Sequence, residues 1–392
     1  MQWLSAKIHP TWHATWLFFG VVAGAALAQL WRWDVMTLVF FGVLGGFFAF
    51  ARPRRLMVLV AFFGGVSLGL ARGSVGQQAL AVYQPLRSQH VRITCVVSDD
   101  VDAAKFGATR MKLTQVRYDG HDLPGRVFVS ATKASAVRRS DRVSVDGILD
   151  EGFGSFPASI KGEVVSASRP VPGDVALEVR DEFAAKVKQA IPEPEASLGV
   201  GYLLGAKSAL PTHLSDALKI AGLTHIVVAS GYNLMILVRI GRRLFAKISK
   251  YLATLSGAAL IVGFIAMTGM SATMMRAGLV AGMGLWAWYV GRKFHPVTML
   301  GLAAMITVLI DPSFALGDLG WLLSFSAFAG VMIIAPIVTS YFFGTERVPF
   351  VGGLLIETLS AIVATTPVMI MAFGQFSVVA PIANVLVVPM IP

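Results

Sequence analysis

Long apolar runs separated by short polar turns occupy both ends of the chain. The first 71 residues hold three of them, at Trp12–Leu30, Val35–Phe50 and Leu56–Leu70. Each is close to the ~20 residues that a helix needs to cross the hydrocarbon core of a bilayer. Residues 1–71 are therefore predicted to form three N-terminal membrane helices. A cleavable signal peptide is the alternative for the first run, because Ala26-Leu27-Ala28 resembles a cleavage site.

Residues 72–170 replace the long runs with the period-two alternation that is typical of β-strands. Turn dipeptides such as Asp119-Gly120 and Pro124-Gly125 separate the alternating segments. The predicted strands are His90–Val97, Met111–Asp119, Arg126–Ala131, Val143–Leu149 and Ile160–Ala167. Short strands in this number fit a small barrel of the OB type, with a β-sandwich as the alternative.

Residues 171–206 are predicted to form an amphipathic helix and a linker. Val175, Val179, Phe183 and Val187 recur at every fourth position among charged residues. This spacing indicates a helix on the outer membrane surface or against neighbouring helices. Residues 207–392 are predicted to form a second membrane domain. Its apolar segments are Leu223–Ile240, Leu252–Met267, Thr273–Val290, Val297–Ile310, Trp321–Ile337, Leu354–Phe373 and Val378–Pro392.

The predicted fold class is a mainly α-helical, polytopic membrane bundle with one inserted extracytoplasmic OB-like β-barrel. Only 14% of the 392 residues are charged and 55% are hydrophobic, whereas soluble domains carry ~25% charged residues. The net charge is +11. Because basic loops of membrane proteins tend to stay in the cytoplasm, this excess is attributed to cytoplasmic loops. Threading the helices puts Arg52–Arg55, Arg239–Lys250 and Arg292-Lys293 on the cytoplasmic side of the cell membrane. The N-terminus is then cytoplasmic and the β-domain is outside.

The composition offers little for metal or redox chemistry. Cys95 is the single cysteine, and the seven histidines form no His-x-His or His-Glu-x-x-His pair. No metal, cofactor or catalytic site is predicted.

Polar residues within the apolar segments are candidates for chemistry. His225, Ser230 and Asn233 share one segment, where a Ser-Gly step loosens the helix beside protein or a water-filled cavity. A hydrogen-bonded contact between helices is the alternative. Arg276 is expected to face a partner or a hydrated path, with snorkelling to the interface as the alternative. Asp311 and Asp318 are the carboxylates considered as its partners.

Pairs of glycines four residues apart predict close helix packing and no function of their own. These pairs are Gly20/Gly24, Gly65/Gly69 and Gly278/Gly282.

The β-domain is mildly basic, with 14 Lys and Arg against 10 Asp and Glu between Arg72 and Arg169. Basic grooves with stacking aromatic rings are how such barrels hold single strands. The predicted outer DNA-binding surface consists of Lys105, Arg110, Lys112, Arg117 and Arg126. The interleaved rings of Phe106, Tyr118 and Phe128 are expected in the barrel core, with stacking on DNA as the alternative.

A series of motifs runs in order from Leu198 to the end of the chain. It comprises Gly205–Pro211, Leu218–His225, Ala229–Gly231, Ser271–Ala277, Asp311-Pro312, Leu323–Phe325, Thr366-Pro367, Phe373–Ser377, Pro381–Asn384 and Val388-Pro389. The series resembles the membrane domain of the ComEC family of competence proteins. The N-terminal helices and the β-domain resemble that family in architecture alone.

This resemblance implies a channel that passes single-stranded DNA through the cytoplasmic membrane during natural transformation. The implied partners are single-stranded DNA, the lipid bilayer, a DNA receptor, a cytoplasmic DNA motor and a separate nuclease domain. The residues expected along the path are His225, Ser230, Asn233, Arg276, Asp318, Ser324, Gln375 and Asn384. A transporter or flippase for another polar solute is the alternative. A membrane enzyme is disfavoured because no nucleophile–base pair is found.

Two features depart from the family's pattern. Relatives often continue into a metallo-β-lactamase-like domain, whereas this chain stops at Pro392 inside an apolar segment. A fragment, or a second polypeptide that supplies the nuclease, is therefore expected. Tyr232-Asn233 also stands where many relatives have Leu-His, so a proton-related role of that histidine does not transfer.

Overall fold

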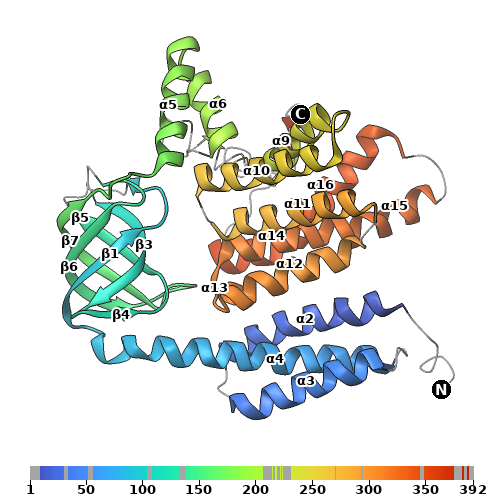
Figure 1. The fold of residues 1–392 in the computed structure, drawn as a ribbon, viewed down its shortest axis with the longest axis horizontal. Helices are drawn as coiled ribbons and strands as arrows, with labels where there is room; N and C mark the ends of the chain where they lie inside the picture. Colours follow the sequence, from blue (N-terminus) through green and yellow to red (C-terminus); the bar gives the residue numbers. More distant parts are fainter. Residues whose placement is uncertain are drawn as a thin grey trace. The chain divides into compact units, whose positions relative to one another are not determined.

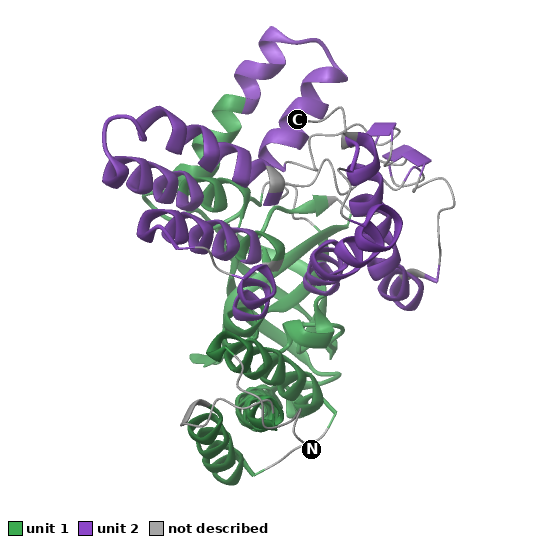
Figure 2. Ribbon diagram, turned by 90° about the vertical axis from the view of Figure 1, so that its right-hand side faces the viewer, with its two compact units in different colours: residues 1–183, 263–275, 304–318 green, residues 184–262, 276–303, 319–392 purple. Residues whose placement is uncertain are grey.

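The computed structural model describes residues 9–30, 34–51, 56–103, 108–132, 137–205, 231–269, 271–292, 295–344 and 348–374, with 214, 217–218, 221, 223, 382–383 and 386–387. The chain forms two compact units (Figure 2). Unit 1 comprises residues 1–183, 263–275 and 304–318, and unit 2 comprises residues 184–262, 276–303 and 319–392.

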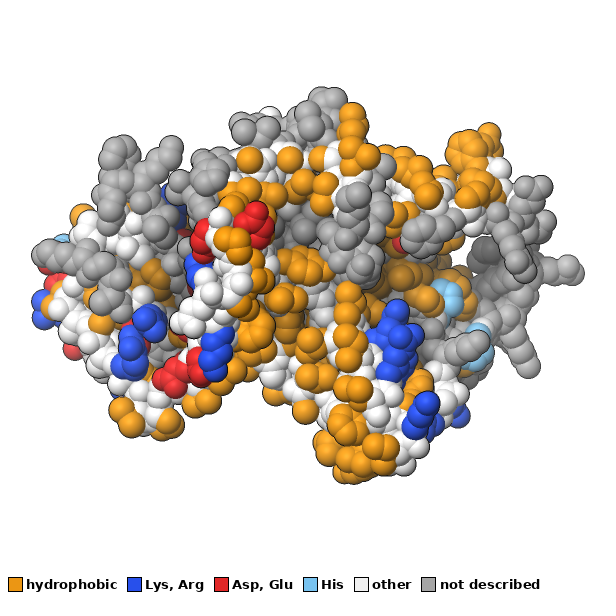
Figure 3. All heavy atoms as spheres, turned by 90° about the horizontal axis from the view of Figure 1, so that it is seen from above, with side chains coloured by type: hydrophobic (Ala, Val, Ile, Leu, Met, Phe, Trp, Pro, Cys, Tyr) orange, Lys and Arg blue, Asp and Glu red, His pale blue; other side chains and the backbone are white. Residues whose placement is uncertain are grey.

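Several helices have the dimensions of membrane spans. Within the described residues, five stretches are long and apolar enough to cross a bilayer: Pro10–Ala28, Leu56–Leu86, Lys250–Thr268, Leu319–Phe343 and Val351–Ala372. Many large hydrophobic side chains remain exposed on the surface, and they cover broad areas of the face in Figure 3. A soluble monomer rarely exposes such large apolar patches. The predicted polytopic membrane fold is confirmed.

The N-terminal helices of unit 1 pack through glycines. Helices α2 (Pro10–Ala28) and α3 (Val35–Ala51) lie against α4 (Leu56–Leu80) (Figure 1). A Cβ atom on Gly24 would lie 2.1 Å from the Val66 carbonyl oxygen, and one on Gly65 would lie 2.2 Å from that of Leu17. The close packing predicted for these glycines is confirmed. At Gly282 the same prediction is wrong, because a Cβ atom there would meet no described atom within 4 Å.

Helix α4 continues past its apolar run and leads into the barrel through the 3₁₀ helix η1 (Ala81–Leu86) (Figure 1). Tyr83 of η1 is 1% exposed and packs within the hydrophobic core of the barrel. The core is built from alternate residues of every main strand, which the period-two pattern predicts.

The barrel is a closed ring of five strands. These are β1 (His90–Val97), β3 (Thr109–Tyr118), β5 (Val127–Thr132), β6 (Arg142–Glu151) and β7 (Ala158–Ser168). They pair in the order β1–β6–β7–β5–β3 and back to β1. Strands β5 and β7 are parallel and the other pairs are antiparallel. Two short strands, β2 (Asp102–Ala103) and β4 (His121–Leu123), pair with β3. Because this ring of strands is closed, the predicted OB-like barrel is confirmed and the alternative β-sandwich is not.

Most of the remaining helices belong to unit 2. They are α6 (Glu195–Leu204), α9 (Gly231–Phe245), α14 (Leu319–Ala329), the π-helical η4 (Gly330–Ile334), α15 (Ala335–Phe343) and α16 (Phe350–Phe373). Four helices are divided between the two units: α5 (Val175–Ala190), α10 (Lys250–Thr268), α11 (Ala272–Val290) and α12 (Pro296–Ile310). Helix α13 (Phe314–Gly317) belongs to unit 1. Gly330 packs on α16, because its Cβ atom would lie 2.4 Å from the Ser360 carbonyl oxygen. The predicted segment Val378–Pro392 lies outside the described residues except at 382–383 and 386–387.

Candidate nucleic-acid interface

Strands β3, β5 and β7 form an outer face of the barrel that carries cations in register. Two rows of paired residues cross the three strands. Their side chains point away from the core, because the neighbouring positions on each strand are the buried ones. We call this set the β3–β5–β7 face: Lys112, Phe128 and Ser159 in one row, and Arg110, Ser130 and Lys161 in the other.

The cations of the β3–β5–β7 face are accessible. Arg110 is exposed and has no ion pair within the described part of the chain. Lys112 lies 3.0 Å from Asp99, and Lys161 lies 3.0 Å from Asp150, but the two lysine side chains remain 43% and 76% exposed. Exposed ion pairs contribute about 0–1 kcal/mol. Little free energy would therefore be lost if either lysine exchanged its carboxylate for another anion.

Of the other predicted surface cations, Arg117 lies in the hairpin of β3 and β4. Its guanidinium donates a 2.8 Å hydrogen bond to Asp122, and this bond lowers the pKa of the Asp122 carboxyl. Arg117 thus lies at the opposite end of β3 from Arg110 and already has a partner. Lys105 lies outside the described residues.

Arg126 anchors the barrel to the end of the apolar helix α12. It is 20% exposed, lies 3.3 Å from the Asp311 carboxylate just after α12, and stacks 4.8 Å from the ring of Phe314. Asp311, one of the two carboxylates predicted as partners of Arg276, is paired with Arg126 instead. Arg126 serves as a junction residue within unit 1 more than as an open phosphate site.

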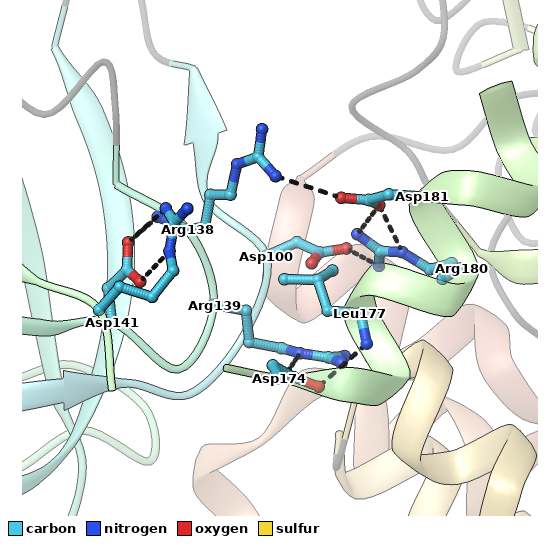
Figure 4. Close-up of polar contacts among 9 residues, drawn as sticks. Asp100, Arg138, Arg139, Asp141, Asp174, Leu177, Arg180 and Asp181 are labelled. Carbon is cyan, nitrogen blue, oxygen red and sulfur yellow. Dashed lines mark hydrogen bonds and ion pairs between the residues drawn. The ribbon is translucent and has the colours of Figure 1, made fainter. Parts of the chain in front are cut away.

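Two buried arginines add further links between the barrel and its surroundings (Figure 4). Arg139, between β5 and β6, binds Asp174 at 2.8 Å and the carbonyls of residues 266–267 in the last turn of α10. Arg180 of α5 binds Asp100 at 2.6 Å. Cations are favourable at helix C-termini, where carbonyls lack intrahelical partners. The barrel is thereby fixed to α5 and to the end of α10.

An aromatic cluster of Phe128, Phe153 and Phe156 lies beside the β3–β5–β7 face. The ring centroids of Phe128 lie 5.0 Å from Phe153 and 5.6 Å from Phe156, and the last two are 5.6 Å apart. Phe128 points outward, so its predicted place in the core is wrong, whereas Tyr118 packs against the core as expected. Phe106 lies outside the described residues.

Sequence reasoning missed Phe153, Phe156 and Lys161. The available signal was the run from Gly152 to Pro157, which places two phenylalanines among glycine, serine and proline in a turn between strands. Side chains in a turn do not alternate between the two faces of a sheet, so strand periodicity does not direct a phenylalanine there into the core.

In the membrane domain, the guanidinium of Arg276 on α11 lies over two aromatic rings of α14. Its guanidinium carbon is 5.7 Å from the ring centroids of both Phe325 and Phe328 of α14. Its buried Nε forms no hydrogen bond with any described residue. A cation over aromatic faces is stabilised by the ring quadrupoles, and an arginine held in an apolar segment normally marks a partner or a hydrated path.

Of the remaining predicted path residues, the structure describes Asn233, Ser324 and Asp318. Asn233 is 8% exposed and donates a 2.7 Å hydrogen bond to the Tyr202 carbonyl. Ser324 is half-buried on α14, and Asp318 ends the last segment of unit 1. His225, Ser230, Gln375 and Asn384 lie outside the described residues.

Metal ligands do not gather in this chain as far as the structure describes it. No group of three or more His, Cys, Asp or Glu side chains there is placed to hold a metal ion.

Comparison with known proteins identifies the family that the C-terminal half of the chain resembles. The model of the competence protein family matches residues 202–392. ComE operon protein 3 of Bacillus subtilis (strain 168) is 22% identical over 221 residues, which are 54% of this chain and 27% of that protein. The chain thus spans about a quarter of the length of this relative. No solved structure matches the chain. The helical segment 202–392 therefore belongs to the competence protein family.

Proposed function

We propose that this chain passes single-stranded DNA inward through the cytoplasmic membrane during natural transformation. The observation that carries the proposal is the β3–β5–β7 face, whose cations lie in register on a barrel joined to membrane helices of a competence family protein. A phosphate backbone is attracted to such a face without regard to base sequence.

The proposed orientation has the N-terminus in the cytoplasm and the barrel outside. Support comes from unit 1, where Arg139 and Arg126 bind the C-terminal ends of α10 and α12. Alternating threading of the helices assigns those two ends to the side of the barrel, and the basic clusters to the opposite side. The barrel then receives DNA at the outer ends of the helices.

Within the helices, Arg276 is the proposed contact for the passing phosphates. A polyanion crossing the bilayer needs hydrated and preferably cationic surfaces. Asn233, Ser324, Asp318 and the predicted path residues outside the described part are proposed to line the same path. A surface DNA receptor, a cytoplasmic DNA motor and a nuclease domain are the proposed partners in this role.

The test is gene deletion with DNA uptake measured in two steps. Deletion is expected to abolish the recovery of transformants while labelled DNA still accumulates at the cell surface. Complementation with the intact gene restores transformants. Unchanged transformation in the deletion strain would end the proposal, and it would favour a transporter or flippase for another polar solute.

A further inference from the structure

The aromatic cluster has no role in the barrel core. Val127 and Val129, which flank Phe128 in the chain, are fully buried, whereas Phe128 points outward. Phe153 is 53% exposed. Three packed rings thus form an apolar patch on a surface whose other members are cations and serines. Exposed apolar patches of this kind mark sites of interaction.

The rings are held in place before any ligand arrives. The Phe156 N–H donates a 3.1 Å hydrogen bond to the Phe153 carbonyl, which closes the turn between β6 and β7. Gly154 in this turn has φ of +59°, and a Cβ atom there would lie 2.6 Å from the Gly317 carbonyl of α13. Because the loop is braced against α13, binding would order few additional groups.

Cations share the face with the rings. Lys112 is the direct cross-strand neighbour of Phe128, and such neighbours have Cβ atoms about 5 Å apart. Arg110 and Lys161 lie in the next row. A ligand that satisfies this surface presents flat apolar rings and negative charges at alternating positions. An unpaired nucleic-acid strand does this, because its bases stack on aromatic rings while its phosphates meet cations.

We infer that the aromatic cluster is a stacking platform for the unpaired bases of single-stranded DNA. This inference rests on the proposed function and deepens it by naming the part of the strand that the barrel contacts. The bases of a duplex are already stacked on one another, so the platform selects a single strand. Arg126 lies 5.9 Å from the Phe156 ring and pairs with Asp311, which places the platform at the outer end of α12.

Fluorescence anisotropy on the full chain in lipid nanodiscs tests the platform. The probes are a labelled oligothymidine, an abasic strand of the same length and a duplex of that length. The wild-type protein is expected to bind oligothymidine more tightly than the abasic strand or the duplex. Phe153→Ala is expected to weaken oligothymidine binding roughly five- to hundredfold and to leave abasic binding unchanged.

Three further variants control for folding and for non-specific apolar contact. Phe128→Leu keeps an apolar side chain but removes a ring, and it is expected to lose the same preference for bases. Phe153→Trp restores an aromatic face and is expected to bind like the wild type. Phe183→Ala removes a phenylalanine of similar exposure, 46%, from α5, and it is expected to have no effect.

Equal affinity of the wild type for oligothymidine and for the abasic strand would overturn the inference, as would unchanged binding by Phe153→Ala. Base-dependent binding in detergent micelles that vanishes in nanodiscs would mean that lipid covers the rings, and it would overturn the inference too. The deletion test stays separate. A chain that transformation requires, but whose binding ignores the bases, keeps its channel function and loses only the platform.

Discussion

The Arg139 guanidinium donates a 2.8 Å hydrogen bond to the Asp174 carboxylate and two more to the Ala266 and Met267 carbonyls. Its side chain is 5% exposed and that of Asp174 is 16% exposed. One arginine thereby joins the barrel, the start of α5 and the last turn of α10. This contact fixes the barrel to α5 and to the end of α10.

Arg139→Gln is expected to lower the thermal stability of the purified protein markedly. Breaking a buried ion pair by removing one partner costs about 3–5 kcal/mol, because the other charge stays buried. Lys161→Gln is the matched control, since its pair with Asp150 is exposed and contributes at most about 1 kcal/mol. Apparent Tm in detergent micelles is the measurement, and equal Tm shifts in the two variants would contradict the role assigned to Arg139.

Acid below pH 3.8 is expected to loosen the same junction. Burial raises the pKa of Asp174, but hydrogen bonds from Arg139, the Leu177 N–H and Ser140 outweigh burial and bring the pKa below 3.8. Because the folded carboxyl binds its proton more weakly than the unfolded one, the stabilisation is present above pH 3.8 and is lost as the pH falls below it. The measurement is limited proteolysis of the protein between pH 6 and pH 3, which reports this loss of stability as faster cleavage. Asp174→Asn should flatten the profile, and an unaltered profile in that variant would refute the assignment.

Cys95 is expected to resist thiol reagents in the folded protein. It is 1% exposed in the barrel core, and burial raises its pKa to about 12. Since the thiolate is the reactive form, a maleimide at pH 8 should modify Cys95 only after unfolding. Mass spectrometry of the intact chain with and without denaturant gives the result. Rapid labelling of the native protein would mean that the barrel does not enclose this residue.

Glycine substitutions are expected to separate packed positions from open ones. Gly24→Ala and Gly65→Ala put a Cβ atom within 2.2 Å of a carbonyl oxygen on the facing helix, and overpacking of this kind typically costs about 1–3 kcal/mol. Gly282→Ala is the control, because no described atom lies within 4 Å of its Cβ position. Loss of stability in the first two variants alone, measured as Tm, is the expected result. A similar loss in Gly282→Ala would argue against the described packing.

Arg276→Ala is expected to block transformation while leaving insertion and yield unchanged. The variant removes the cation that lies over the rings of Phe325 and Phe328, so transport of phosphates would lose its proposed contact. Arg292→Ala, at an exposed position after α11, is the control and should transform normally. Transformant counts are compared at equal amounts of membrane protein. Wild-type counts for Arg276→Ala would remove this residue from the path.

The sequence by itself determined the elements and their class. Hydrophobic runs of membrane length mark the helices, because no water is present in the bilayer to satisfy an exposed backbone. The alternation in His90–Val97 marks a strand with the bounds observed, since one face of the barrel wall must be buried. The sequence also predicted the close packing at Gly24 and Gly65, because small residues four positions apart in an apolar helix are typical of close helix contacts.

Only the tertiary structure decided which partners distant residues take. The sequence suggested Asp311 as a partner of Arg276. In the fold Asp311 pairs with Arg126 instead, because the closed barrel brings the start of β5 to the end of α12. Phe128 looked like a core residue by type, but its register on β5 turns it outward, where the turn that leads into the neighbouring strand β7 adds Phe153 and Phe156. Such contacts depend on strand order and loop conformation, and local periodicity carries no information about either.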